Sequence, residues 1–335
     1  MRIPYAEMKA EFKRVFLKYG LSEEKAELCA TIHTQTNRDG IYSHGSNRIS
    51  LFASYLKKGW VNAEGAPVKE KEFGAIEVYN GNLGPGITNA VFCVDRAIEL
   101  AKKFGIGLIG LKNTTHWMRA GTYGLRAADQ GFIGINWTNV DGAMPPWGGM
   151  EGRLGNNPFV MAAPSPDGTP LLLDMAMSLY SYGKLQVTRL AGKKLPFPGG
   201  FDKDGNLTDD PKVVEETRRL LPMGYWKGAS FAFILDILSA ILSDGGATID
   251  IDNAGKGICG RCSQAFIVID PQKTSSTEHI NEIITRSRAY IKTSALAEGH
   301  KEIRSPGEGI AAARKENDEK GIFVDDTVWA EIKAL

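Results

Sequence analysis

The amino-acid sequence predicts an α/β protein in which a helical N-terminal unit precedes a substantial sheet. The first sixty residues repeat apolar side chains at helical spacing. Between residues 75 and 269, short apolar segments alternate with longer helical ones, as is typical of strands and helices packed in layers. The chain has 335 residues, of which 43% are hydrophobic and 24% charged, so it can bury a large core without disulfide bonds.

Three helices are expected in the N-terminal unit, over residues 4–19, 22–36 and 46–58. Gly20 ends the first helix, and Ser22 is a suitable N-cap for the second. Residues 38–45 connect the second helix to the third.

Strands and helices then alternate. Strands are expected at residues 75–79, 106–111, 132–138, 159–163, 171–175 and 266–269, and helices at 88–104, 120–130, 230–243, 276–298 and 308–320. The helix at 230–243 is apolar on most faces, so we expect it to be buried. Three Gly/Pro-rich loops, at 141–155, 195–205 and 305–309, are long and irregular, and such loops commonly carry function.

The overall composition argues against nucleic-acid and membrane partners. Forty basic and 39 acidic residues give a net charge of +1, which creates no field that would attract nucleic acid. The longest apolar stretch, at 231–242, contains Asp236 and is too short to span a bilayer. The N-terminal residues lack a signal-peptide core, and four cysteines are too few for a secreted disulfide scaffold, so we expect a cytoplasmic protein.

Residues Gly105 to Gly110 match the pattern G-x-G-x-x-G, but their context argues against a dinucleotide fingerprint. In that fingerprint the glycines follow a strand and open a helix whose N-terminus faces the pyrophosphate. Here a helix precedes the glycines, and Ile106, Leu108 and Ile109 alternate with them as in a buried strand. We therefore expect these glycines to permit close packing.

Cys259 and Cys262 form a C-x-x-C pair. One pair without a second cluster of ligands is weak evidence for zinc or for a redox centre. His279 and His300 lie in helical, surface-like segments and lack metal-ligand spacing. We expect incidental thiols and no metal site.

His44 is the leading candidate for an acid–base residue among the five histidines. The ordinary imidazole pKa of ~6.5 suits proton transfer at neutral pH. His44 lies where the connector enters a helix, and Arg48 follows one turn later, so a proton donor and a carboxylate-binding guanidinium can lie side by side. A helix entry capped by Ser43, with Arg48 on the surface, explains the same residues equally well.

His116 is a second candidate because it lies between an expected strand and an expected helix. Ligands bind at strand ends in α/β sheets. The alternative is a turn histidine that holds the local backbone. His33 lies in mid-helix, where packing or surface exposure explains it.

Beyond these local patterns, the chain resembles the malate/L-lactate dehydrogenase family, which is unrelated to the Rossmann-type dehydrogenases. The resemblance covers essentially the whole chain and rests on long runs. Those runs are Tyr42-Ser43-His44-Gly45 with Arg48, and residues 113–123, 144–148, 154–158, 173–178, 221–228 and 304–308.

The resemblance implies a non-Rossmann nicotinamide-binding α/β fold with a large mixed sheet, and a homodimer. The proton donor of the family falls on His44. The implied cofactor is NADH, with NADPH left open because no residue can be assigned to the ribose 2′ position. Its contacts fall on three segments: Pro170, Leu171, Leu172, Leu173, Asp174, Met175 and Ala176; Trp226 and Lys227; and Gly307, Glu308 and Gly309.

We therefore expect an oxidoreductase that reduces the C2 keto group of a small α-keto acid. His44 would protonate the developing alkoxide, Arg48 would hold the carboxylate, and His116 would hydrogen-bond the substrate or the nicotinamide. Malate/lactate-type and cyclic imino acid reductases are alternatives within the family. A non-catalytic dinucleotide-binding protein is the alternative outside enzymes, although it has no need for a proton donor.

On this basis the chain divides into three parts. Residues 1–60 form a helical segment that carries the catalytic histidine and packs with the C-terminal helices. Residues 61–300 form the α/β core that binds cofactor and substrate. Residues 301–335 form a C-terminal segment with a cofactor contact and helices.

Overall fold

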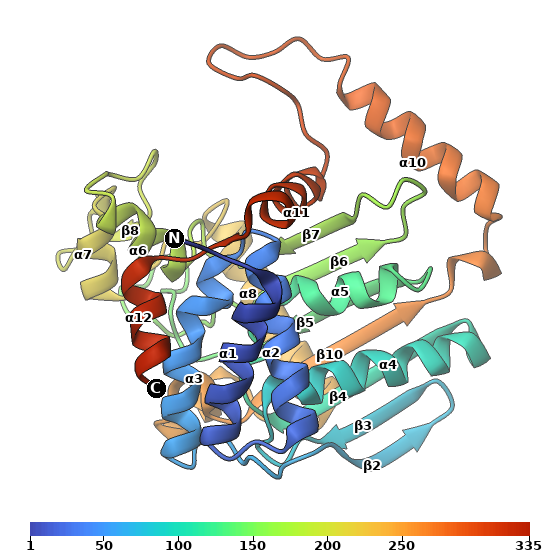
Figure 1. The fold of residues 1–335 in the computed structure, drawn as a ribbon, viewed down its shortest axis with the longest axis horizontal. Coiled ribbons are helices and arrows are strands. Elements are labelled where there is room, and N and C mark those ends of the chain that lie inside the picture. The colour runs from blue at the N-terminus through green and yellow to red at the C-terminus, as the bar shows by residue number, and fades with distance from the viewer.

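A seven-stranded mixed sheet lies at the centre of the computed structural model, which describes residues 1–335 (Figure 1). Its strand order is β2-β3-β4-β10-β5-β6-β7. Only β3 and β4 are parallel; every other neighbouring pair is antiparallel. The strands are β2 (Val68–Phe73), β3 (Ile76–Asn80), β4 (Ile106–Thr114), β5 (Ile133–Thr138), β6 (Phe159–Ala163), β7 (Leu171–Met175) and β10 (Cys262–Ile269). This order confirms the expected α/β fold with a large mixed sheet.

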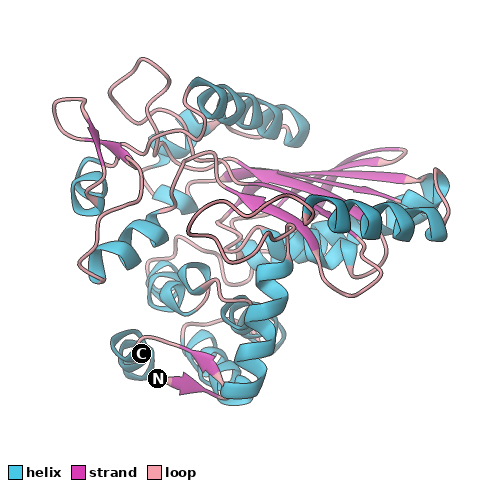
Figure 2. Cartoon of the chain, turned by 90° about the horizontal axis from the view of Figure 1, so that it is seen from above, coloured by secondary structure: helices cyan, strands magenta, loops and turns pink.

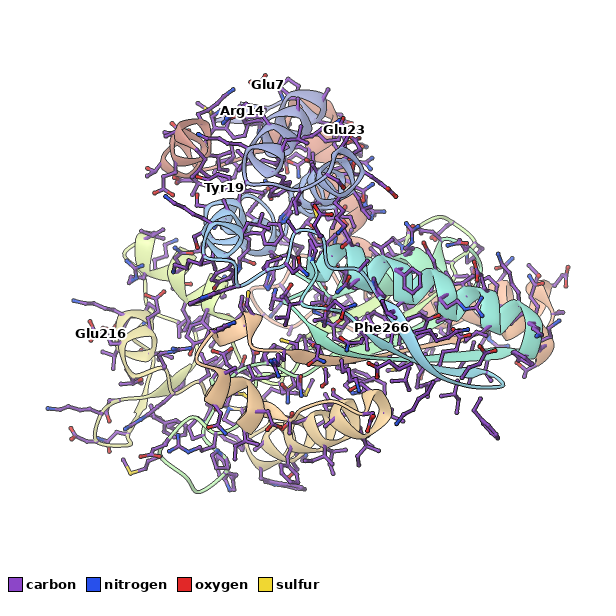
Figure 3. All side chains as sticks on the ribbon, turned by 90° about the horizontal axis from the view of Figure 1, so that it is seen from below. Glu7, Arg14, Tyr19, Glu23, Glu216 and Phe266 are labelled. Atoms are coloured by element: carbon purple, nitrogen blue, oxygen red, sulfur yellow. The ribbon has the colours of Figure 1, made fainter.

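Helices cover both faces of the sheet. Helices α4 (Gly86–Phe104) and α5 (Gly121–Ala128) pack on one face, and α8 (Trp226–Ser243) packs on the other against β10, β4 and β5 (Figures 1 and 2). Phe266 of β10, labelled in Figure 3, is fully buried and meets the Trp117 ring edge-on at 5.7 Å between centroids. The sheet therefore lies between two layers of helices.

The expected N-terminal helices are confirmed as α1 (Tyr5–Lys18), α2 (Glu23–Arg38) and α3 (Ile49–Lys57). The Ser22 hydroxyl caps α2 by accepting a hydrogen bond from the Lys25 amide at 3.3 Å. The two ends of the chain meet here, because β1 (Arg2–Ile3) pairs with β11 (Ile322–Phe323), and α12 (Asp326–Ala334) packs on α1 and α3. Helix α11 (Glu308–Lys320) contacts α2.

The glycine pattern at 105–110 is structural, as expected. Gly105 ends α4 in the left-handed conformation (φ +84°). A Cβ atom on Gly107 would lie 2.3 Å from the Ala97 carbonyl oxygen of α4, and one on Gly110 would lie 2.0 Å from the Leu242 carbonyl oxygen of α8. These two glycines therefore let helices approach β4 from opposite faces, and no helix follows them.

Several short elements were not expected from the sequence. They are β2, the hairpin of β8 (Gly200–Phe201) and β9 (Leu207–Thr208), and the helices α6 (Tyr182–Leu190), α7 (Pro211–Thr217) and α9 (Thr248–Ala254). Strand β2 alternates lysine and glutamate and is exposed throughout, so it has no apolar period. The two strands of the hairpin have two residues each, and the three helices span at most nine residues, little more than two turns. Helix α10 (Thr277–Ile291) reaches away from the sheet and ends before residue 298. Residues 292–302 are almost all exposed, so no packing extends that helix.

The expected burial of the 230–243 helix is only partly correct. The sheet-facing side of α8 is buried, but Phe233, Ile234 and Ile241 are more than half exposed on its outer side. The helix also begins four residues earlier than expected, at Trp226. With 18 residues it is long and apolar enough to cross a membrane by length and composition, although here one side of it covers the sheet.

Candidate active site

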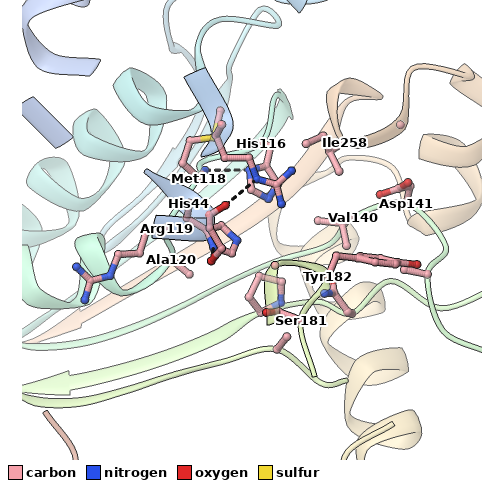
Figure 4. Close-up of a pocket in the computed structure, with 18 of the residues that line it drawn as sticks. His44, His116, Met118, Arg119, Ala120, Val140, Asp141, Ser181, Tyr182 and Ile258 are labelled. Atoms are coloured by element: carbon pink, nitrogen blue, oxygen red, sulfur yellow. Dashed lines mark hydrogen bonds between the residues drawn. The ribbon is translucent and has the colours of Figure 1, made fainter. Parts of the chain in front are cut away.

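His44, Arg48 and His116, the three residues expected to act on substrate, line one cavity of about 590 Å³ (Figure 4). Its volume is that of a typical small-molecule site. The walls combine apolar side chains with convergent polar ones. The other polar residues that line it are Ser43, Tyr55, Arg119, Asp141, Asn156, Asp174, Ser181, Tyr182 and Arg218.

A short 3-10 turn at Tyr42–His44 presents His44 to the cavity. The turn lies tightly against α2 because Gly45 lacks a side chain: a Cβ atom there would lie 1.7 Å from the Asn37 side-chain oxygen. That oxygen instead accepts a hydrogen bond from the Ser46 amide at 2.8 Å. The Ser43 hydroxyl lies 3.0 Å from Nδ1 of His44, so Nε2 is the ring nitrogen left for a ligand.

The surroundings of His44 strongly disfavour its charged form. Burial, together with the nearby Arg48 and Arg119 guanidinium groups, lowers the pKa of His44 to about 3. The imidazole is therefore neutral in the ligand-free protein at physiological pH. An anion bound beside it would reverse part of this effect by neutralising the arginines and favouring the imidazolium.

His116 follows β4 and lies beside His44. The ring centroids are 6.1 Å apart and the planes are inclined by 17°. The Met118 amide donates a hydrogen bond to Nδ1 of His116 at 3.0 Å, so the neutral ring carries its proton on Nε2. Burial lowers the pKa of His116 well below its ordinary value, which keeps this neutral form. His116 thus offers a fixed N–H donor.

Arg48 is a cation without an ion-pair partner. Its Nε donates to the Ser43 carbonyl oxygen at 3.1 Å, and no carboxylate lies within ion-pair distance. Enclosure by protein lowers the pKa of Arg48. A largely desolvated guanidinium normally has a carboxylate or phosphate partner, because its charge is otherwise costly to bury. The missing partner indicates an anionic ligand.

Two of the three segments expected to bind the cofactor lie next to each other. Gly307 begins α11 in the left-handed conformation (φ +95°), and a Cβ atom there would lie 1.7 Å from the Pro170 carbonyl oxygen. Within the Pro170–Ala176 segment, Asp174 and Ala176 line the cavity that holds His44. The Asp174 carboxylate accepts a hydrogen bond from the Gly121 amide at 2.9 Å, and burial raises its pKa.

The third segment lies outside the cavity lining. Trp226 and Lys227 begin α8, with the Lys227 ammonium 6.0 Å from the centre of the exposed Trp226 ring. A bridge between Ser178 and Pro222 brings this region beside the residues that follow β7. The Glu308 carboxylate at the start of α11 pairs with Lys292 at 2.5 Å. The Glu308 side chain is therefore already engaged.

An extended buried ion pair behind the cavity was not recognised in the sequence. The Asp39 carboxylate pairs with Arg119, which is 3% exposed, and with Arg314 of α11 at 2.6 Å. Arg119 in turn lies 3.7 Å from Asp174. These residues come from four distant parts of the chain, so no local pattern joins them. The network ties α2 and α11 to the segment expected to bind the cofactor.

The tyrosine and aspartate residues of the cavity wall were also missed. Tyr55, Asp141, Tyr182 and Arg218 belong to no recognisable spacing pattern. One signal was present for Asp141, because it opens the Gly/Pro-rich loop at 141–155 that we expected to carry function. Burial raises the pKa of Tyr55 to about 12, so its hydroxyl stays protonated and can donate a hydrogen bond.

Cys259 and Cys262 are buried free thiols. Burial raises the pKa of Cys259 to about 12 and that of Cys262 further still. Thiols that remain protonated are poor nucleophiles and poor metal ligands, so they are inert in this environment.

The chain matches known proteins over essentially its whole length. A family model described as malate/L-lactate dehydrogenase matches residues 3–333. The chain belongs to the malate/L-lactate dehydrogenase family. It is therefore an oxidoreductase of a family that uses a nicotinamide cofactor. This membership confirms the resemblance seen in the sequence.

Individual members of the malate/L-lactate dehydrogenase family match over the full chain. The sequence is 43% identical to 2,3-diketo-L-gulonate reductase from Escherichia coli (strain SMS-3-5 / SECEC), over 100% of both chains. The structure of malate dehydrogenase from Entamoeba histolytica superposes with a TM-score of 0.95 at 26% identity, covering 100% of this chain and 96% of that one. Δ1-Piperideine-2-carboxylate reductase from Pseudomonas syringae gives a TM-score of 0.87 at 25% identity, covering 100% and 99%.

Proposed function

We propose that this dehydrogenase uses NADH to reduce the C2 keto group of a small α-keto sugar acid, converting 2,3-diketo-L-gulonate to 3-keto-L-gulonate. The full-length 43% identity to proteins named 2,3-diketo-L-gulonate reductase supports this substrate over those of the more distant malate dehydrogenase and imino acid reductase. NADPH is the alternative cofactor.

The observation that carries the proposal is the unpaired Arg48 beside two neutral histidines. A carboxylate on Arg48 would place the adjacent keto carbon near the imidazoles of His44 and His116. A bidentate guanidinium–carboxylate pair fixes orientation as well as position. A protein that only bound dinucleotides would have no use for this combination.

The residues of this chain would then polarise the keto group and transfer the proton. Bound nicotinamide supplies the hydride. His116 would donate its Nε2–H to the keto oxygen, which polarises the carbonyl. His44 would deliver a proton from Nε2, the nitrogen that Ser43 leaves free. Because His44 is neutral in the ligand-free protein, the proton is taken up as the anionic substrate binds.

The residues proposed to hold the cofactor are Pro170 to Ala176, Trp226, Lys227 and Gly307 to Gly309. Their arrangement fits a group that runs from the cavity towards α11, since Asp174 and Ala176 line the cavity and Pro170 touches Gly307. Asp174 would orient the cofactor or the neighbouring Arg119. Lys227 is the cation available for a phosphate or ribose.

The test is oxidation of NADH, followed at 340 nm, with a panel of α-keto acids. We expect the highest kcat/KM with 2,3-diketo-L-gulonate. Preference for oxaloacetate, pyruvate or a cyclic imino acid would instead support one of the other family activities. Absence of turnover with all of them, together with retained NADH binding, would indicate a non-catalytic protein.

We also propose a homodimer that acts in the cytoplasm. The exposed apolar side chains on the outer side of α8, among them Phe233, Ile234 and Ile241, form a surface that a second copy can cover. Four cysteines held as free thiols suit a reducing compartment. Light scattering at micromolar concentration should give twice the 36.5 kDa mass of the chain.

A further inference from the structure

A second group of polar side chains lines the cavity away from the histidines. We call Asp141, Tyr182 and Arg218 the distal polar wall. Figure 4 shows His44 and His116 on one side of the cavity and Asp141 and Tyr182 on the other. The Arg218 guanidinium donates a hydrogen bond to the Asp141 carboxylate at 3.3 Å. The proposed mechanism uses none of these three residues.

Three separate elements bring the distal polar wall together. Asp141 follows β5, Tyr182 begins α6, and Arg218 ends α7. Arg218 adopts the left-handed conformation (φ 55°), which is uncommon for a residue with a long side chain. The α7 turn holds it there, because the Arg218 amide donates to the Val214 carbonyl oxygen at 3.0 Å. The fold thus holds Arg218 in an uncommon backbone conformation, and its side chain lines the cavity.

The distal polar wall has hydrogen-bonding capacity that the protein does not use. The Tyr182 hydroxyl is buried beside the Arg218 guanidinium, but the two groups are not aligned as a good hydrogen bond. The Asp141 side chain is 17% exposed, against 63% for Arg218, and accepts from no side chain other than Arg218. Burial raises the pKa of Asp141, and the Arg218 charge opposes that rise. Buried polar groups of this kind normally have partners, so the missing ones belong to a ligand.

We propose that the distal polar wall binds the hydroxyl groups of the substrate's tail and so selects polyhydroxylated 2-oxo acids. This inference rests on the proposed function, which places the carboxylate of the substrate on Arg48 and its keto group at His44. The remaining carbons of a six-carbon acid then extend towards Asp141 and Tyr182. Hydroxyl groups donate to the Asp141 carboxylate and exchange hydrogen bonds with the Tyr182 hydroxyl.

The same wall disfavours two other kinds of tail. A purely apolar tail leaves the Asp141 carboxylate and the Tyr182 hydroxyl with Arg218 as their shared partner and no further one, and sites built for hydrogen bonds discriminate strongly against such analogues. A tail that ends in a second carboxylate meets the negative charge of Asp141. Arg218 offsets only part of that repulsion, because it is the more exposed partner and is already paired with Asp141.

Three six-carbon acids test the inference: 2,3-diketo-L-gulonate, 2-oxohexanoate with an apolar tail, and 2-oxoadipate with a carboxylate tail. The parent enzyme should favour the first. Tyr182→Phe, which removes only the hydroxyl, and Asp141→Leu should each lower kcat/KM for 2,3-diketo-L-gulonate, by about 10- to 100-fold for Asp141→Leu. Neither change should lower kcat/KM for 2-oxohexanoate. Asp141→Asn should raise kcat/KM for 2-oxoadipate, because the repulsive charge is gone.

Asp209→Leu is the matched control, because Asp209 forms a surface ion pair with Lys194 at 3.1 Å outside the cavity. It should leave the order of the three acids unchanged. NADH binding, measured by fluorescence, establishes that each variant is folded. Equal losses for all three acids in Asp141→Leu and Tyr182→Phe would overturn the inference and leave the proposed function standing. If the parent reduces none of the three acids, the proposed function itself fails.

Discussion

Three histidines are held in neutral form, His33 in the core and His44 and His116 in the cavity wall, and their exposure on unfolding makes the stability of the protein depend on pH. Burial lowers the pKa of His33 to about 4 and that of His44 to about 3, and it lowers the pKa of His116 well below its ordinary value. At pH 5 the unfolded chain binds protons at all three sites and the folded chain does not. The free energy of unfolding therefore falls as pH decreases below ~6.5, the ordinary imidazole pKa.

His33 allows this effect to be measured apart from the active site. Its ring is fully buried among Phe12, Phe16 and Phe52. One proton taken up on unfolding changes the free energy of unfolding by at most ~1.4 kcal/mol per pH unit. Protonation of His33 in the unfolded chain should therefore lower the free energy of unfolding by about 2 kcal/mol between pH 7 and pH 5. All three histidines together should lower the free energy of unfolding by about 6 kcal/mol over the same interval, or ~3 kcal/mol per pH unit. Carboxylates with raised pKa values, such as Asp174 and Asp236, act in the opposite direction.

The variant His33→Leu removes one of the three protons while leaving the carboxylates in place. Urea unfolding followed by circular dichroism at pH 7 and pH 5 should show that the parent loses about 2 kcal/mol more than the variant over this interval. His279→Leu, at an exposed position on α10, should behave like the parent. Parallel losses in the parent and in His33→Leu would refute the claim that burial holds His33 neutral.

Three further substitutions test the cavity and the cofactor assignment. Arg48→Lys should raise KM for keto acids more than for their methyl esters, because lysine lacks the planar fork of the guanidinium. Equal effects on both would show that Arg48 does not bind the carboxylate. Gly107→Ala should lower the free energy of unfolding by about 3 kcal/mol through its contact with Ala97, while NADH affinity stays within a small factor of the parent. Lys227→Ala should do the reverse: it should weaken NADH binding in a fluorescence titration and leave the melting temperature almost unchanged. Unchanged NADH affinity would show that Lys227 does not contact the cofactor.

Elements with a clear apolar period could be predicted from the sequence. Helices α1, α2 and α4 and strands β5 to β7 lie within a few residues of their expected positions, because their inward-facing side chains repeat regularly. The hairpin of β8 and β9 and the short helices α6, α7 and α9 could not be predicted, since tertiary contacts and turns determine them. The exposed side of α8 was missed because apolar composition alone does not distinguish a helix that is buried all round from one that leaves an apolar surface.

The centre of the candidate site could be predicted, but its periphery could not. His44 and Arg48 are close in sequence, and His116 follows a recognisable strand, so local patterns and the family resemblance identified them. Asp141 and Arg218 are 77 residues apart and meet only in the folded chain. The orientation of Lys227 relative to a cofactor likewise depends on the packing of α8, which no local spacing encodes.

The central claim is that His44 supplies the proton during reduction of the keto group. The most direct measurement compares the parent with His44→Gln, using turnover of NADH at 340 nm and NADH binding by fluorescence on the same preparations. We expect turnover to fall by ~10²-fold or more, as for loss of a general acid, while NADH affinity is nearly unchanged. Near-normal turnover in the folded variant would contradict the claim and remove His44 from the mechanism.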